Sequence, residues 1–151
     1  MGIAPDFEQG IQEFNQQEFY ACHDTLEAIW VEAPEVDKRF YQGILQVAVG
    51  CYHLSNDNLR GAIILLGEAV RRLCDYQPEY EEVNVELLLG QTNDLLLALQ
   101  QLKPGQGKDF FEQLQQIKNP QTEIFVASLD KTKNLINFCQ IPYINMVIND
   151  D

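Results

Sequence analysis

The sequence has few basic residues, no long apolar run and no segment typical of a targeting signal. Ten Lys and Arg stand against 23 Asp and Glu, which gives a net charge of −13. A charge of this sign repels phosphates, so neither nucleic acid nor an anionic membrane is an expected partner. No stretch approaches the ~20 apolar residues of a membrane span, and no basic residue precedes an apolar run near Met1. We therefore expect a soluble, cytoplasmic protein.

Closely spaced cysteines and a glycine-rich phosphate loop are also missing. The cysteines form no Cys-x-x-Cys pair, which argues against zinc ribbons and thioredoxin-type sites; they are Cys22, Cys51, Cys74 and Cys139. Three of them fall in apolar helical segments, and we expect buried thiols there. Glycines within predicted helices, such as Gly43 and Gly50, indicate close helix crossing. No nucleophile has an acid-base partner that the sequence can place, which argues against nucleophilic catalysis. Two histidines and one carboxylate are a minimal set of metal ligands, so we predict neither a cofactor nor a metal.

Apolar residues recur at helical spacing through the first two thirds of the chain. They predict five helices, over about residues 5–15, Glu18 to Ala33, Val36 to Leu54, Leu59 to Tyr76 and Asn84 to Lys103. The third helix is apolar on most sides, which is typical of a helix in the middle of a bundle. The fifth carries a seam of apolar positions and, beside it, the surplus residues Leu87, Leu89, Leu96 and Leu97. These leucines predict a second covered face, packed against the C-terminal segment or against the other subunit of a homodimer.

A linker, Lys103 to Gly107, divides the chain because Pro and Gly together prevent a continued helix. We assign residues 1–103 to a helical bundle domain and residues 104–151 to an extension that packs on the bundle or on a partner. The extension holds a predicted short helix, Phe110 to Ile117, and two stretches rich in β-branched and aromatic residues, Thr122 to Leu129 and Ile141 to Ile148. The predicted fold is therefore a single all-α bundle of about five helices with a partly extended C-terminal tail.

Two polar stripes follow the second and third predicted helices. The first contains Tyr20, His23, Glu27 and Trp30, and the second contains Arg39, Gln42, Gln46, Gly50 and His53. The short connection between the helices predicts an antiparallel hairpin, in which residue numbers that sum to about 69 or 70 lie level. This register places Trp30 beside Arg39, Glu27 beside Gln42, and His23 beside Gln46. His53 is expected roughly 10 Å along the axis from His23.

Three interpretations of the stripes stay open. They form a structural polar layer, with Glu27 paired to Arg39 and the glutamines bonded to His23. Alternatively, they line a small-ligand pocket with an aromatic wall from Trp30 and Tyr20. In the third interpretation His23 and Glu27 hold a metal with a third ligand from His53 or Glu68. The first two interpretations bury Glu27, so we expect Glu27→Gln to change the stability by over about 1 kcal/mol.

The same residues resemble the domain-of-unknown-function family 309. The resemblance rests on His-x-x-x-Glu-x-x-Trp at residues 23–30, on the Gln-containing apolar helix that ends in Tyr52-His53, and on Asn58-x-x-Gly61-Ala62. It covers about residues 7–75 and implies a small all-helical fold with no established activity. Gln17 and Asp24 depart from the Gly and Glu that are usual there. An extension like residues 104–151 is typical of cyanobacterial members.

The resemblance carries His23, Glu27, Trp30, Gln42, Gln46 and His53 onto matching positions without giving any of them a role. We therefore expect a non-enzymatic binding or interaction protein, whose partner is a small molecule or another protein. The candidate site comprises both stripes: Tyr20, His23, Glu27, Trp30, Arg39, Gln42, Gln46 and His53. The alternative is a metal-dependent hydrolase or oxidase that uses the His23/Glu27 pair.

Overall fold

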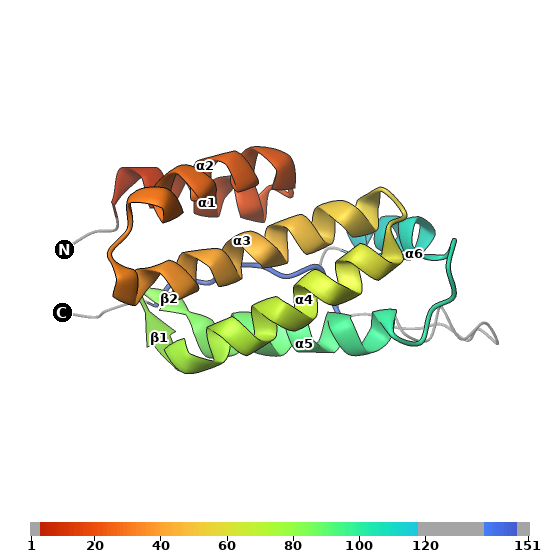
Figure 1. The fold of residues 1–151 in the computed structure, drawn as a ribbon. Helices are drawn as coiled ribbons and strands as arrows, with labels where there is room; N and C mark the ends of the chain where they lie inside the picture. Colours follow the sequence, from red (N-terminus) through yellow and green to blue (C-terminus); the bar gives the residue numbers. More distant parts are fainter. Residues whose placement is uncertain (1–3, 118–137, 148–151) are drawn as a thin grey trace.

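The computed structural model describes residues 4–117 and 138–147 of the chain (Figure 1). Within these ranges the protein is an all-helical bundle with one very small sheet, which confirms the predicted fold class. The elements are α1 (Pro5–Asn15), α2 (Phe19–Glu32), α3 (Glu35–Ser55), α4 (Leu59–Leu73), the 3-10 helix η1 (Cys74–Tyr76), β1 (Glu79–Tyr80), β2 (Val83–Asn84), α5 (Val85–Leu99) and α6 (Gly107–Gln115). None of the helices in these ranges is both long enough and apolar enough to cross a membrane.

Capping residues account for several helix boundaries. Pro5 opens α1 at a position where its missing N–H costs nothing. The side chains of Asn58 and Asn84 accept hydrogen bonds of 3.0 Å from the backbone N–H groups of Gly61 and Leu87, at the starts of α4 and α5. Two helices are shorter than predicted: α4 tightens into η1 after Leu73, and α5 ends at Leu99. Helix α6 begins three residues before the predicted Phe110.

The sequence did not predict the hairpin between η1 and α5. Its two strands pair antiparallel, with Glu79 opposite Asn84 and Tyr80 opposite Val83. The turn residues, Glu81 and Glu82, both have positive φ angles, 49° and 62°. Asn and Gly are the usual residues at such positions, so two glutamates give no recognisable turn signal.

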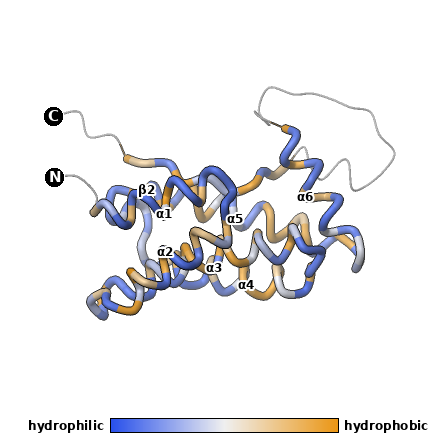
Figure 2. Tube along the Cα trace, turned by 90° about the horizontal axis from the view of Figure 1, so that it is seen from above, coloured by the Kyte–Doolittle hydropathy of each residue, from blue (hydrophilic) through white to orange (hydrophobic). Residues whose placement is uncertain are grey.

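Helix α3 occupies the middle of the bundle, as predicted. Helices α2, α3 and α4 lie on one side of the molecule, and α1, α5 and α6 lie on the other (Figure 2). Ten residues of α3 are buried. Two glycines of α3 let α4 cross it closely. A Cβ atom added at Gly43 would lie only 2.8 Å from the Leu73 side chain, and one added at Gly50 would lie 2.8 Å from the Leu66 side chain. The prediction of close crossing at these glycines is confirmed.

Residues 138–147 run in an extended conformation along α1 and α5. The Asn15 side chain exchanges two hydrogen bonds with the backbone of Ile144, at 3.0 and 2.8 Å. Tyr143 N donates to Gln91 Oε1 (2.9 Å), and Val83 forms an isolated bridge with Met146. The predicted stretch Thr122 to Leu129 lies outside the described residues. One cluster of buried side chains includes members from Phe7 to Ile144.

The surplus leucines of α5 divide into two groups. Leu89 and Leu96 are half-buried and pack against the core. Leu87 and Leu97 are 43% and 53% exposed.

The cysteines also divide into two groups: Cys22, Cys51 and Cys139 are buried, whereas Cys74 is exposed. The expectation of a buried thiol is wrong for Cys74 because it lies after the last buried turn of α4.

Candidate functional site

The first polar stripe lies along the side of α2 that borders α3. His23 is half-buried, with Nδ1 3.1 Å from Asp24 Oδ1 and Nε2 3.6 Å from Glu27 Oε2. The side chain of Glu27 is 56% exposed. The expectation that Glu27 is buried is therefore wrong, because the carboxylate extends past the edge of α2 into solvent instead of across to α3.

Trp30 contacts Lys38 rather than the predicted Arg39. The Lys38 ammonium lies 5.2 Å from the centroid of the indole ring and donates hydrogen bonds of 3.2 Å to the carbonyls of Trp30 and Val31. These carbonyls belong to the last turn of α2, where the helix dipole attracts a cation. Arg39 is exposed and forms no ion pair with Glu27. The indole Nε1 is buried and has no hydrogen-bond partner within the described residues.

Gln46 bonds to α4 and not to His23. Its Nε2 donates to Glu68 Oε1 (3.0 Å), and its Oε1 accepts from Arg72 Nη1 (3.1 Å). Arg72 also pairs with Glu68 at 3.2 Å, so three side chains form one closed cluster between α3 and α4. The spacing of Glu68 and Arg72 by four on a helix was the available sequence signal for this cluster. A structural polar layer exists here, but its members differ from those predicted. Gln42 is half-buried and is not bonded to Glu27.

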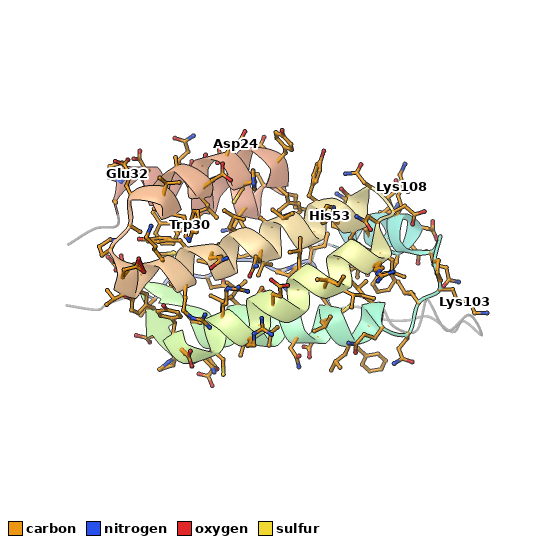
Figure 3. All side chains as sticks on the ribbon, viewed as in Figure 1. Asp24, Trp30, Glu32, His53, Lys103 and Lys108 are labelled. Carbon is orange, nitrogen blue, oxygen red and sulfur yellow. The ribbon has the colours of Figure 1, made fainter. Side chains whose placement is uncertain are left out.

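His53 belongs to the far end of α3. Its Nδ1 lies 3.3 Å from Nδ2 of Asn58, the N-cap residue of α4. Trp30 and His53 lie toward opposite ends of α3 (Figure 3). Near His53 in the sequence, Tyr52 packs on Tyr20 of α2 with ring centroids 5.5 Å apart. The structure thus joins Tyr20 to both His23, with ring centroids 6.2 Å apart, and Tyr52, but keeps His53 in a separate contact.

The first stripe lies on an open face. Four grooves of about 450 to 620 Å³ lie between described residues, and none of them is lined by His23, Glu27 or Trp30. Both residues considered as a third metal ligand, His53 and Glu68, have other partners. Within residues 4–117 and 138–147, no group of three or more His, Cys, Asp and Glu side chains is placed to hold a metal.

Burial raises the pKa values of the two thiols that lie beneath this face, Cys22 and Cys51. The Cys22 thiol donates to the carbonyl of Gly10 at 3.4 Å. Burial, with a smaller contribution from Glu13, raises the pKa of Cys22 to about 12. Burial also raises the pKa of Cys51 to about 12, and the neighbouring Cys22 adds to the shift. At neutral pH both thiols are protonated, which makes them poor nucleophiles.

Sequence reasoning missed the polar groups at the end of the molecule that carries the hairpin. Tyr80 hydrogen-bonds to Asp37, and this contact together with burial raises the pKa of the Tyr80 hydroxyl. Burial, with the carboxylates of Asp37 and Glu82, raises the pKa of Glu81. No sequence signal was available, because Asp37 lies on α3 and its partners lie on a hairpin that the sequence did not predict.

Comparison with known proteins finds a family match over the part of the chain that contains the first stripe. Residues 7–65 match the family described as Domain of unknown function (DUF309). The chain is 35% identical over 86 residues to the uncharacterized protein YpuF of Bacillus subtilis (strain 168). The alignment covers 56% of this chain and 46% of that relative, so the chain spans less than half the length of the relative.

No solved structure matches the chain significantly. The matched region contains α1, α2, α3 and the start of α4, and with them the His-x-x-x-Glu-x-x-Trp stripe of α2. Over residues 7–65 the chain is similar to the domain-of-unknown-function family DUF309.

Proposed function

We propose that the helical bundle is a non-enzymatic interaction domain that binds a protein partner over the open face of α2 and α3. We define the open face by Tyr20, His23, Glu27, Trp30, Val31 and Tyr52. The observation that carries the proposal is the aromatic pair at its edge: Tyr20 is 61% exposed, Tyr52 is 37% exposed, and their rings pack together in solvent. Tyr and Trp are the side chains that most often anchor protein interfaces.

A second exposed apolar residue lies near the other end of α2, beyond the exposed acids Asp24 and Glu27. Val31 is 58% exposed and, by helical spacing, lies on the same side as Tyr20 and Glu27. An apolar area rimmed by polar groups is typical of a surface that a partner covers. His23, Glu27, Trp30 and Val31 line none of the four grooves, which favours a broad macromolecular contact over an enclosed small ligand along this part of α2.

Photo-crosslinking in living cells tests the proposal. A benzophenone side chain at Tyr20 is expected to give one discrete adduct, while the same group at Leu97, on the exposed side of α5, gives none. Adducts of equal yield at both positions, or none at Tyr20, would contradict the proposal.

Metal analysis of the purified protein tests the alternative, a metal-dependent hydrolase or oxidase. The observation that favours this alternative is that both ring nitrogens of His23 lie near carboxylates, those of Asp24 and Glu27. We expect no stoichiometric zinc, iron or manganese. A stoichiometric metal that is lost on His23→Ala would overturn the non-enzymatic proposal.

A further inference from the structure

A groove of about 470 Å³ lies on the other side of α2, between α1, the last two turns of α2 and the turn that leads into α3. Thr25, Ala28, Ile29 and Glu32 line it, and at about 100° per residue they lie opposite His23, Glu27 and Trp30 on the helix. The volume falls within the range of small-molecule sites. This groove is therefore separate from the open face.

The walls of the groove are apolar and aromatic. Ile29 of α2 supplies an aliphatic wall, and Phe7 of α1 and Tyr41 of α3 supply aromatic walls. The Tyr41 ring packs edge-to-face on Phe7, with centroids 5.2 Å apart. An aliphatic chain placed here would cover the apolar surface that Ala28 and Ile29 still expose to water.

Tyr41 also supplies a polar group that lacks a partner. The residue is only 8% exposed, yet its hydroxyl has no hydrogen-bond partner within the described residues. The hydroxyl oxygen keeps contact with solvent, so a ligand atom can bond to it by displacing water. Burial, followed by the nearby carboxylates of Glu81 and Asp37, raises the pKa of Tyr41 to about 12. The hydroxyl is therefore neutral at physiological pH and can accept a hydrogen bond.

The charge around the groove is negative. Asp6 and Glu32 line it, and none of its eleven lining residues is Lys or Arg. The last turn of α2 has no basic residue, so its carbonyls add the negative end of the helix dipole. Lys38, the cation closest in sequence to this turn, is already bonded to the carbonyls of Trp30 and Val31.

We infer that this groove binds a small aliphatic amine. The ammonium group lies against Asp6 and Glu32 and donates to the Tyr41 hydroxyl, while its methylene chain packs on Phe7 and Ile29. Carboxylates supply the charge-assisted hydrogen bonds, and the aromatic walls favour a cation that has an apolar stem. The inference does not depend on the proposed protein interaction, because the two sites share no lining residue.

Calorimetric titration of the full chain with butane-1,4-diamine tests the inference. Butane-1,4-diol, which has the same length and no charge, is the control ligand. Glu32→Gln removes a carboxylate from the groove, and Glu27→Gln makes the same change on the opposite side of α2. Both glutamates are exposed, so both variants are expected to fold. Tyr41→Phe keeps the ring and removes only the hydroxyl.

We expect the diamine to bind at one saturable site and the diol not to bind. Glu32→Gln is expected to weaken binding about tenfold, the usual loss for one charge-assisted hydrogen bond. Tyr41→Phe weakens it less, and Glu27→Gln leaves it unchanged. Equal weakening by Glu32→Gln and Glu27→Gln would show diffuse attraction to an acidic protein and overturn the inference, as would the absence of saturable binding at millimolar diamine.

Discussion

The two sides of α2 differ in a way that the residue types alone do not reveal. The side toward α3 carries the only tryptophan, one of the two histidines and an exposed tyrosine, yet His23, Glu27 and Trp30 line none of the four grooves, and only Tyr20 and Tyr52 border one. The side toward α1 carries Thr25, Ala28, Ile29 and Glu32, which are unremarkable in sequence, and all four line the groove of about 470 Å³. Conspicuous side chains therefore identify a surface, whereas an enclosed volume depends on how the helices pack.

The difference has a physical origin. α1 packs against α2 and closes one side of it with Phe7, whose ring contacts both Phe40 and Tyr41. No described helix covers the other side of α2 beyond its border with α3. Stability is thus concentrated on the α1 side, and the open face can vary at little cost to the fold.

Removing the Phe7 ring should have the largest effect. Phe7 is 1% exposed, so Phe7→Ala is expected to lower the free energy of unfolding by about 3–5 kcal/mol. Tyr20→Ala, on the open face, is expected to change it by less than about 0.5 kcal/mol. Urea denaturation curves measure both. Equal losses would mean that the open face contributes to the core.

Alkaline pH should produce the next largest effect. The Cys22 thiol ionises near pH 9 in the unfolded chain and near pH 12 in the folded protein. Below pH 9 it is protonated in both states, and its contribution to stability is then lost progressively between pH 9 and pH 12. Raising the pH to 10.5 is expected to remove about 2 kcal/mol per buried thiol.

Thermal melts from pH 8 to pH 10.5 measure this loss in the parent and in Cys22→Ala. The variant should lose less stability, both because one thiol is gone and because Cys51 no longer has Cys22 as a neighbour. Parallel pH profiles would show that the thiol beneath α2 is accessible to water.

The Gln46 cluster is the structural exception beside the open face. Gln46→Ala removes two hydrogen bonds and leaves Arg72 and Glu68 less satisfied, so we expect a loss of about 1–2 kcal/mol. Gln42→Ala, one turn away and only half-buried, is the matched control and should cost less than about 0.5 kcal/mol. A Gln46 variant as stable as the Gln42 variant would mean that the cluster contributes nothing to stability.

Glu27→Gln should have the smallest effect. An exposed pair spaced i,i+4 contributes little, so the free energy of unfolding should change by less than about 0.5 kcal/mol. This expected change is smaller than the change of over about 1 kcal/mol that the sequence predicted for a buried Glu27. Denaturant curves that differ from the parent by more than about 1 kcal/mol would restore a buried role for Glu27.

The helical spacing of apolar residues, and the residues that begin or end helices, made much of the fold predictable. Pro5, Asn58 and Asn84 act through their own backbone or side chain, so their effects on helix ends can be read locally. The central position of α3 followed from its nearly continuous apolar surface. The hairpin at Glu81 and Glu82 was not predictable, since tertiary contacts hold both residues in a conformation that Glu rarely adopts.

The candidate site was less predictable because contacts between helices depend on register. A shift of one residue rotates a side chain by about 100°, which brought Lys38 rather than Arg39 to Trp30. Gln46 was correctly identified as a buried polar residue, but its partners are on α4. The groove between α1 and α2 arises from the packing of residues such as Phe7 and Tyr41, and no spacing rule describes such a volume.

A single NMR titration with butane-1,4-diamine tests most directly whether the two sides of α2 act independently. The only indole N–H signal reports on Trp30, and the amide signals of Thr25 and Ile29 report on the groove. The account predicts that the diamine shifts the signals of Thr25, Ile29 and Phe7 and leaves the Trp30 indole in place. A shift of the Trp30 indole with no change at Thr25 would contradict it.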